Sequence, residues 1–66
     1  MIITVNGKGH QVVEGTCLHA LLEQLKVNRQ YVAVEVNTQL VVREHYAERT
    51  LVDGDTVEIV TLVGGG

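Results

Sequence analysis

The sequence closes on the stretch Val57-Glu58-Ile59-Val60-Thr61-Leu62-Val63-Gly64-Gly65-Gly66. Its first part is rich in β-branched and apolar residues, which predicts a final strand from Thr56 to Val63. Side chains alternate along a strand, so one set faces the core while Glu58, Val60 and Leu62 face outward. A strand that is apolar on both faces is typical of a central position, and exposed apolar side chains mark binding surfaces. We therefore expect a central strand with a partner-docking face at these three residues.

The three glycines that follow (the glycine tail, residues 64–66) predict a flexible end to a domain that occupies residues 1–63. Glycine has no Cβ and loses more backbone entropy on ordering than any other residue. Such an end can enter a slot too narrow for side chains, and its only ionisable group is the terminal carboxylate. A frayed terminus or a cloning remnant is the simpler explanation of the tail taken alone.

Composition limits the classes of function. With 66 residues the chain forms one domain, and without Phe or Trp its core must be aliphatic. A net charge of −3 argues against a nucleic-acid partner. The single Cys17 excludes an internal disulfide and a cysteine-ligated iron–sulfur cluster. No apolar run approaches the roughly 20 residues of a membrane span, and no basic signal-peptide region begins the chain, so we expect a cytoplasmic protein without a membrane partner.

The chain begins with a predicted hairpin and helix. Residues Met1–Val5 form the first strand, Asn6–Gly9 the turn and His10–Val13 the return strand. Thr16 is the expected N-cap of a helix over Cys17–Leu25. Four leucines, spaced at i, i+3, i+4 and i+7, form the apolar stripe of that helix: Leu18, Leu21, Leu22 and Leu25.

The second half predicts further strands. Alternating valines indicate a strand over Tyr31–Asn37 with Val32, Val34 and Val36 inward. The remaining predictions are a turn at Asn37-Thr38, a short strand over Gln39–Val42, one helical turn within Arg43–Arg49, a return to the core at Leu51 and Val52, and a turn at Asp53-Gly54-Asp55. This order predicts an α+β domain, a mixed five-stranded sheet with one main helix packed on one face.

Little in the chain suggests chemistry of its own. Cys17 stands at a helix start, where a thiol can be activated for sulfur transfer, although a small residue at that position is the simpler interpretation. His10, His19 and His45 lack the spacing of metal ligands, so no metal site is predicted. No paired acid, base or nucleophile emerges, and we expect a protein that is not an enzyme.

The second half resembles the ThiS family, the sulfur carriers of thiazole biosynthesis for thiamin, which have the ubiquitin-like β-grasp fold. The matching segments are Val36–Arg43, Tyr46, Leu51–Val60, the glycine tail and, in the helix, Gly15–Leu25. The resemblance spans nearly the whole chain. It departs at Val42, where family members often have Pro, and at Tyr46, where they often have Trp.

The resemblance implies a protein substrate whose Gly66 carboxylate is the reactive group. A ubiquitin-activating-type adenylyltransferase (ThiF-like) would adenylate it with ATP and magnesium, and a cysteine desulfurase or other sulfur donor would convert it to a thiocarboxylate. Thiazole synthase (ThiG-like) would take the sulfur. Gly64, Gly65 and Gly66 would enter the partners' active sites, and the chain would need no cofactor of its own.

Two alternatives remain open at the level of sequence. The same carrier chemistry could serve another pathway, such as molybdopterin synthesis or tRNA thiolation. The chain could instead be a non-catalytic β-grasp interaction module with an incidental glycine tail, indifferent to changes at Gly65 and Gly66.

Overall fold

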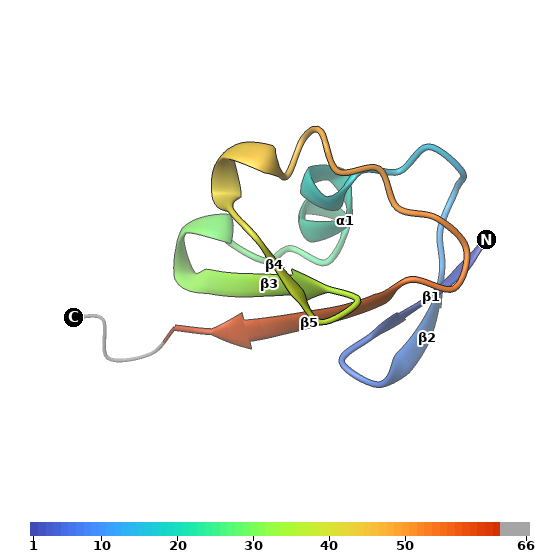
Figure 1. Cartoon of the computed structure of the whole chain (residues 1–66), viewed down its shortest axis with the longest axis horizontal. Coiled ribbons are helices and arrows are strands. Elements are labelled where there is room, and N and C mark those ends of the chain that lie inside the picture. Colours follow the sequence, from blue (N-terminus) through green and yellow to red (C-terminus); the bar gives the residue numbers. More distant parts are fainter. Residues whose placement is uncertain (63–66) are drawn as a thin grey trace.

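The computed structural model describes residues 1–62, so Val63 and the glycine tail, with the predictions made for them, lie outside the described residues. In this described part, one mixed sheet has the strand order β2-β1-β5-β3-β4, and the one α-helix crosses one face of the sheet (Figure 1). The prediction of an α+β fold with a mixed five-stranded sheet is confirmed. The elements are β1 (Ile2–Val5), β2 (Lys8–Gln11), α1 (Leu18–Gln24), the 3₁₀ turn η1 (Arg29–Tyr31), β3 (Val32–Val36), β4 (Gln39–Val41), the 3₁₀ turn η2 (Arg43–His45) and β5 (Thr56–Thr61).

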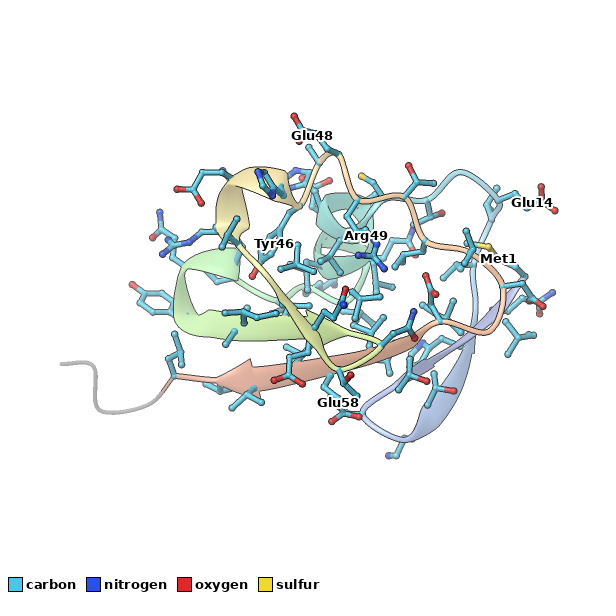
Figure 2. The ribbon with its side chains drawn as sticks, viewed as in Figure 1. Met1, Glu14, Tyr46, Glu48, Arg49 and Glu58 are labelled. Carbon is cyan, nitrogen blue, oxygen red and sulfur yellow. The ribbon has the colours of Figure 1, made fainter. Side chains whose placement is uncertain are left out.

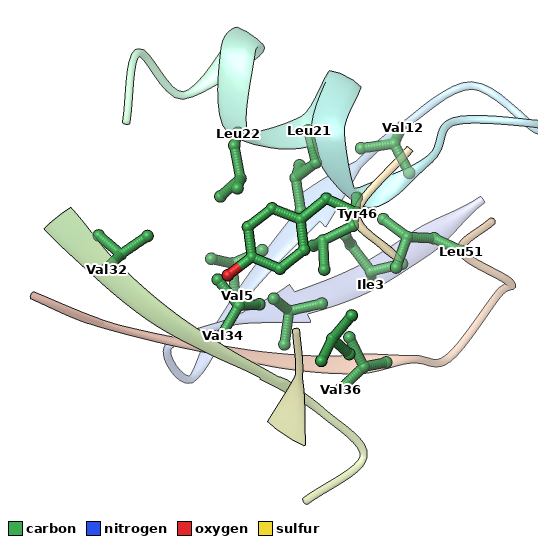
Figure 3. Close-up of a cluster of buried hydrophobic side chains, with 13 residues drawn as sticks. Ile3, Val5, Val12, Leu21, Leu22, Val32, Val34, Val36, Tyr46 and Leu51 are labelled. Atoms are coloured by element: carbon green, nitrogen blue, oxygen red, sulfur yellow. The ribbon is translucent and has the colours of Figure 1, made fainter. Parts of the chain in front are cut away.

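The core lies between α1 and the sheet, and it is built almost wholly from aliphatic side chains (Figure 3). The predicted leucine stripe is confirmed: three of its members are buried and Leu25 is partly buried against the cluster. The inward valines of β3 are buried as well. Tyr46 is the one aromatic residue of this core, only 2% exposed, and it follows the 3₁₀ turn η2 that the sequence predicted as a single helical turn.

The first hairpin differs from the prediction. Its turn contains only Asn6 and Gly7, both at positive φ (50° and 83°), which is the two-residue type that matches the twist of paired strands. β2 therefore starts at Lys8 rather than His10 and ends at Gln11. The residue type of Gly9 predicts a place in the turn, but Gly9 pairs with Thr4 inside the ladder.

The helix also begins differently from the prediction. Cys17 is the N-cap, and its sulfur accepts a hydrogen bond from the Ala20 amide at 3.4 Å. The Thr16 hydroxyl points backward and donates to the Val13 carbonyl at 2.6 Å, so it is not free to cap. At the other end Lys26 adopts a left-handed φ of 59° and, with Val27, returns hydrogen bonds to the last turn, which forms a Schellman stop.

The connection into β5 is fixed by a buried carboxylate. Asp55 is 4% exposed, and it accepts hydrogen bonds from the Asn37 carboxamide and the Val52 amide, both at 2.9 Å. The predicted turn at Asp53-Gly54-Asp55 is confirmed, with Gly54 at φ 88°. The prediction that both Leu51 and Val52 return to the core is half wrong, because Val52 is 59% exposed. Within residues 1–62, no helix is long and apolar enough to span a membrane.

Candidate functional site

The strand that precedes the glycine tail is the central strand of the sheet. β5 is parallel to β1, where Thr4 pairs with Thr56, and antiparallel to β3, where the register runs to Val32 and Thr61. Beyond the strand, the Leu62 amide still donates to the Tyr31 carbonyl at 2.7 Å. The described chain is therefore held by backbone hydrogen bonds up to the residue before Val63. The prediction of a central final strand is confirmed.

Asn6 extends the anchoring of β5 after β1 has ended. Its carboxamide accepts a hydrogen bond from the Ile59 amide at 2.7 Å and donates to the Ile59 carbonyl at 3.2 Å. A single side chain thus replaces the strand neighbour that β1 no longer provides. The sequence marked Asn6 only as a turn residue, since its second role depends on which strand lies beside the hairpin.

Two of the three predicted docking residues, Glu58 and Val60, share the face of β5 that points away from α1, and Leu62 follows directly after the strand. Val60 and Leu62 are 57% and 52% exposed, while Val57 on the opposite face is completely buried. Glu58 is also exposed and projects from the sheet on the side away from the helix (Figure 2). The outward orientation of Glu58, Val60 and Leu62, which follows from strand alternation, therefore agrees with the structure.

Register brings further residues to this surface that the sequence did not single out. Ala33 of β3 lies opposite Val60, and Glu35 of β3 lies opposite both Glu58 on one side and Leu40 of β4 on the other. Leu40 is 65% exposed. Only the pairing of β3 with β4 and β5 reveals this grouping. We call it the outer face, defined by Ala33, Glu35, Leu40, Glu58, Val60 and Leu62.

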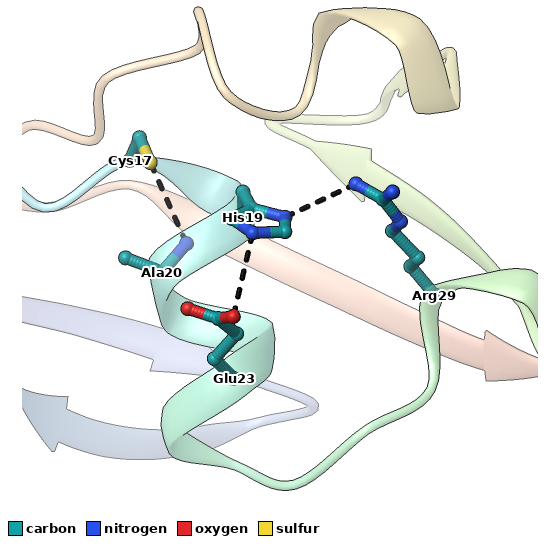
Figure 4. A network of polar contacts seen from close by, with 5 residues as sticks. All are labelled: Cys17, His19, Ala20, Glu23 and Arg29. Carbon is teal, nitrogen blue, oxygen red and sulfur yellow. Dashed lines mark hydrogen bonds and ion pairs between the residues drawn. The ribbon is translucent and has the colours of Figure 1, made fainter.

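The polar side chains around α1 do not form a catalytic arrangement (Figure 4). His19 contacts Arg29 at 3.3 Å through Nδ1 and Glu23 at 3.5 Å through Nε2, and the Glu23 side chain is 71% exposed. The sulfur of Cys17 is engaged in capping the helix. This is a surface network that ties α1 to η1, with the thiol in a structural role.

The histidines, the cysteine and the carboxylates are the side chains that could ligate a metal ion. In the part of the chain that the structure describes, no three His, Cys, Asp or Glu residues are grouped so that they could hold a metal ion. His19 contacts Glu23 within α1, and Glu44 and His45 are exposed neighbours in η2.

Both departures from the family pattern are compatible with the structure, Val42 through its backbone conformation and Tyr46 through its place in the core. Val42 has φ −73° and ψ 151°, a conformation that proline also adopts, and it follows the last residue of β4. Tyr46 fills an aromatic position of the core. Burial raises the pKa of the Tyr46 hydroxyl above its ordinary value, and the positive charge of Arg43 opposes that rise.

A mixed sheet with parallel central strands, a helix across one face and an exposed opposite face defines a ubiquitin-like β-grasp domain. The crystal structure of the thiamine biosynthesis protein ThiS from Geobacter metallireducens superposes with a TM-score of 0.87 and 42% identity, covering all of both chains. The sulfur carrier protein ThiS of Escherichia coli is 35% identical over 66 residues, again the full length of both. The ThiS family model matches residues 3–66.

The chain belongs to the ThiS family. The predictions of a β-grasp fold, of a sulfur carrier of this family and of a carrier rather than an enzyme are thereby confirmed. A thiazole synthase from Paramagnetospirillum magneticum is 38% identical over 66 residues. That match covers the whole of this chain but only 20% of the synthase, so the chain spans about a fifth of that relative's length.

Proposed function

We propose that the chain carries sulfur for thiazole formation in thiamin biosynthesis, as a thiocarboxylate at Gly66. The observation that carries the proposal is that the family match extends through residue 66, and so includes the glycine tail that follows the central strand. At about 3.3–3.6 Å per residue, the four residues after Leu62 reach at most about 13–14 Å beyond it. The reacting carboxylate would then operate within that radius of a firmly held strand.

The chemistry follows from the weakness of a carboxylate as an electrophile. A carboxylate oxygen of Gly66 attacks the α-phosphorus of ATP in the activating enzyme, pyrophosphate leaves, and an acyl adenylate forms. Magnesium in that enzyme balances the phosphate charges. Hydrosulfide delivered by a sulfur donor adds to the acyl carbon, and AMP leaves as the carbon–oxygen bond breaks. The product is an ionised thiocarboxylate, which is a polarisable sulfur nucleophile.

The partners are proposed on the same basis. The activating enzyme is a ubiquitin-activating-type adenylyltransferase, the sulfur source a cysteine desulfurase or an equivalent donor, and the setting the cytoplasm. Thiazole synthase is the proposed acceptor, a choice supported by the full-length match of this chain to part of two thiazole synthases. Glu58, Val60 and Leu62, exposed beside the exit of β5, are the proposed docking residues.

The test is a charging assay read by intact mass. The chain is incubated with the activating enzyme from the same genome, ATP, magnesium and sulfide, and we expect a species in which one oxygen is replaced by sulfur. A synthetic or ligated version whose Gly66 carboxyl is an amide is the matched control, since it differs by one group and should stay uncharged. If the free carboxylate yields no ATP-dependent species, or the amide is charged equally well, the proposal fails.

A further inference from the structure

An open pocket lies between the two 3₁₀ turns. Its volume is about 470 Å³, and its lining consists of Arg29, Arg43, Glu44 and Ala47. Arg29 is the first residue of η1 and Arg43 is the first residue of η2. Two segments that are distant in the sequence therefore each supply one guanidinium to the same pocket.

Contact with α1 positions Arg29. Its side chain extends from η1 toward the helix, and Nη1 lies 3.3 Å from Nδ1 of His19 (Figure 4). A guanidinium only donates hydrogen bonds, so Nδ1 is the acceptor and the ring proton belongs on Nε2, which faces Glu23 at 3.5 Å. The contact orients Arg29 without neutralising its charge, and it uses only part of the donor capacity of the guanidinium.

The lining of the pocket carries a net positive charge. Within residues 1–62, neither Arg29 nor Arg43 forms an ion pair with a carboxylate. Glu44 contributes one carboxylate to the lining, against two guanidinium groups. The excess of positive charge lies in a chain whose net charge is −3, so the pocket is a local site of attraction for anions on an otherwise acidic molecule.

The two guanidinium groups favour one class of anion. Each guanidinium presents a planar fork of N–H donors that binds two oxygens of a carboxylate or a phosphate. A carboxylate has only two oxygens and one charge, which a single fork satisfies. A phosphate group has at least three free oxygens and up to two charges, so it can use both forks at once.

We propose that the pocket between η1 and η2 binds a phosphate group through Arg29 and Arg43. Two sources carry that group, inorganic phosphate or pyrophosphate on one side and a nucleotide on the other. Both 3₁₀ turns lie on the side of the domain where β5 ends (Figure 1), and the Leu62 amide donates to the Tyr31 carbonyl of η1 at 2.7 Å. The inference does not depend on the charging of Gly66.

Titration of the full chain, followed by NMR of the arginine side-chain Nε–H signals, tests the proposal. Inorganic phosphate, pyrophosphate and AMP are added separately at constant ionic strength, and adenosine is the matched ligand without a phosphate. We expect saturable shifts at Arg29 and Arg43 with the phosphate compounds and none with adenosine. Binding of all three shows that the phosphate group suffices, and binding of AMP alone assigns the site to nucleotides. Equal binding of adenosine and AMP overturns the proposal.

Substitutions in the pocket give the second readout. Arg29→Gln and Arg43→Gln should each weaken binding about fivefold or more, because each removes a charge-assisted contact. Arg49→Gln is the matched control, since it makes the same change of charge at a residue that lines a different pocket, and its Kd should change less than about twofold through screened, longer-range charge effects. Glu44→Gln should strengthen binding, because it removes the carboxylate from the lining.

All four substituted residues are at least partly exposed, so we expect the variants to fold, and an unchanged backbone amide spectrum checks this. The inference is overturned if the Arg29 and Arg43 variants bind as tightly as Arg49→Gln. It is also overturned if the wild-type shifts do not saturate and are equally large at the other basic side chains, since that pattern is general ion screening rather than a site.

Discussion

Replacing Asn6 by glycine removes the side chain that anchors β5 where β1 has ended. The two hydrogen bonds lost are the Ile59 amide to Asn6 Oδ1, at 2.7 Å, and Asn6 Nδ2 to the Ile59 carbonyl, at 3.2 Å. Asn6 has a φ of 50°, which glycine adopts freely, so the substitution introduces no backbone strain. At about 0.5–1.5 kcal/mol per hydrogen bond, and with both bonds exposed, we expect a loss of about 1–2 kcal/mol in the free energy of unfolding.

Chemical and thermal denaturation measure this loss, since 1 kcal/mol corresponds to about 4–8 °C in Tm for a domain of this size. Hydrogen exchange adds a local readout: protection of the Ile59 amide should fall more than that of the Asn37 amide, which bonds to the Thr56 carbonyl at 2.7 Å. Asn6→Asp is the matched variant, because aspartate keeps an acceptor for the Ile59 amide but cannot donate to the Ile59 carbonyl. The free energy of unfolding of Asn6→Asp should lie between those of the wild type and Asn6→Gly. Wild-type stability in Asn6→Gly, with unchanged protection of Ile59, would refute the anchoring role.

Three further substitutions test other parts of the account. Lys26→Gly should raise the free energy of unfolding by about 1 kcal/mol in denaturant, because Lys26 has an unfavourable left-handed φ at the helix stop. Gln24→Gly inside α1 should lower the free energy of unfolding by about as much. A change of the same sign in both variants would contradict this explanation. Val42→Pro should raise the free energy of unfolding by about 0.4–1 kcal/mol, because φ −73° suits proline and the unfolded chain loses conformational freedom. A lower Tm would show that the Val42 amide is needed. Tyr46 has a raised folded-state pKa, so its contribution to stability is complete below about pH 10 and is lost as pH rises through the folded-state pKa. In Tyr46→Phe, the free energy of unfolding should therefore fall less steeply above about pH 10 than in the wild type. Parallel curves of unfolding free energy against pH for the two proteins would contradict this prediction.

The periodic parts of the fold could be predicted from the sequence. Alternating valines in β3 and the leucine stripe of α1 report burial directly, because each pattern repeats with the period of its element. The central position of β5 followed from a strand that is apolar on both faces. Local chemistry was predicted less well. Gly9 is a residue type common in turns but lies in the β1–β2 ladder, and the threonine beside Cys17 suggested the wrong N-cap.

The residues of the candidate site also differ in how well the sequence predicted them. The outward direction of Glu58, Val60 and Leu62 needed only strand alternation, so it was predicted. Glu35 and Leu40 were not identified, because their place beside Glu58 depends on the pairing of β3 with β5, two strands that are distant in the sequence. The buried Asp55 is a similar case with respect to Asn37, which only the completed fold brings to it, whereas its other partner, Val52, is three residues away.

The most direct test of the central claim is to locate the sulfur after ATP-dependent charging by fragmenting the intact protein in a mass spectrometer. The proposal predicts that the added sulfur lies in the C-terminal fragment that contains Gly66, and that Cys17→Ser is charged to the same extent as the wild type. Sulfur found on Cys17, or charging abolished by Cys17→Ser, would contradict a carrier whose reactive group is its terminal carboxylate.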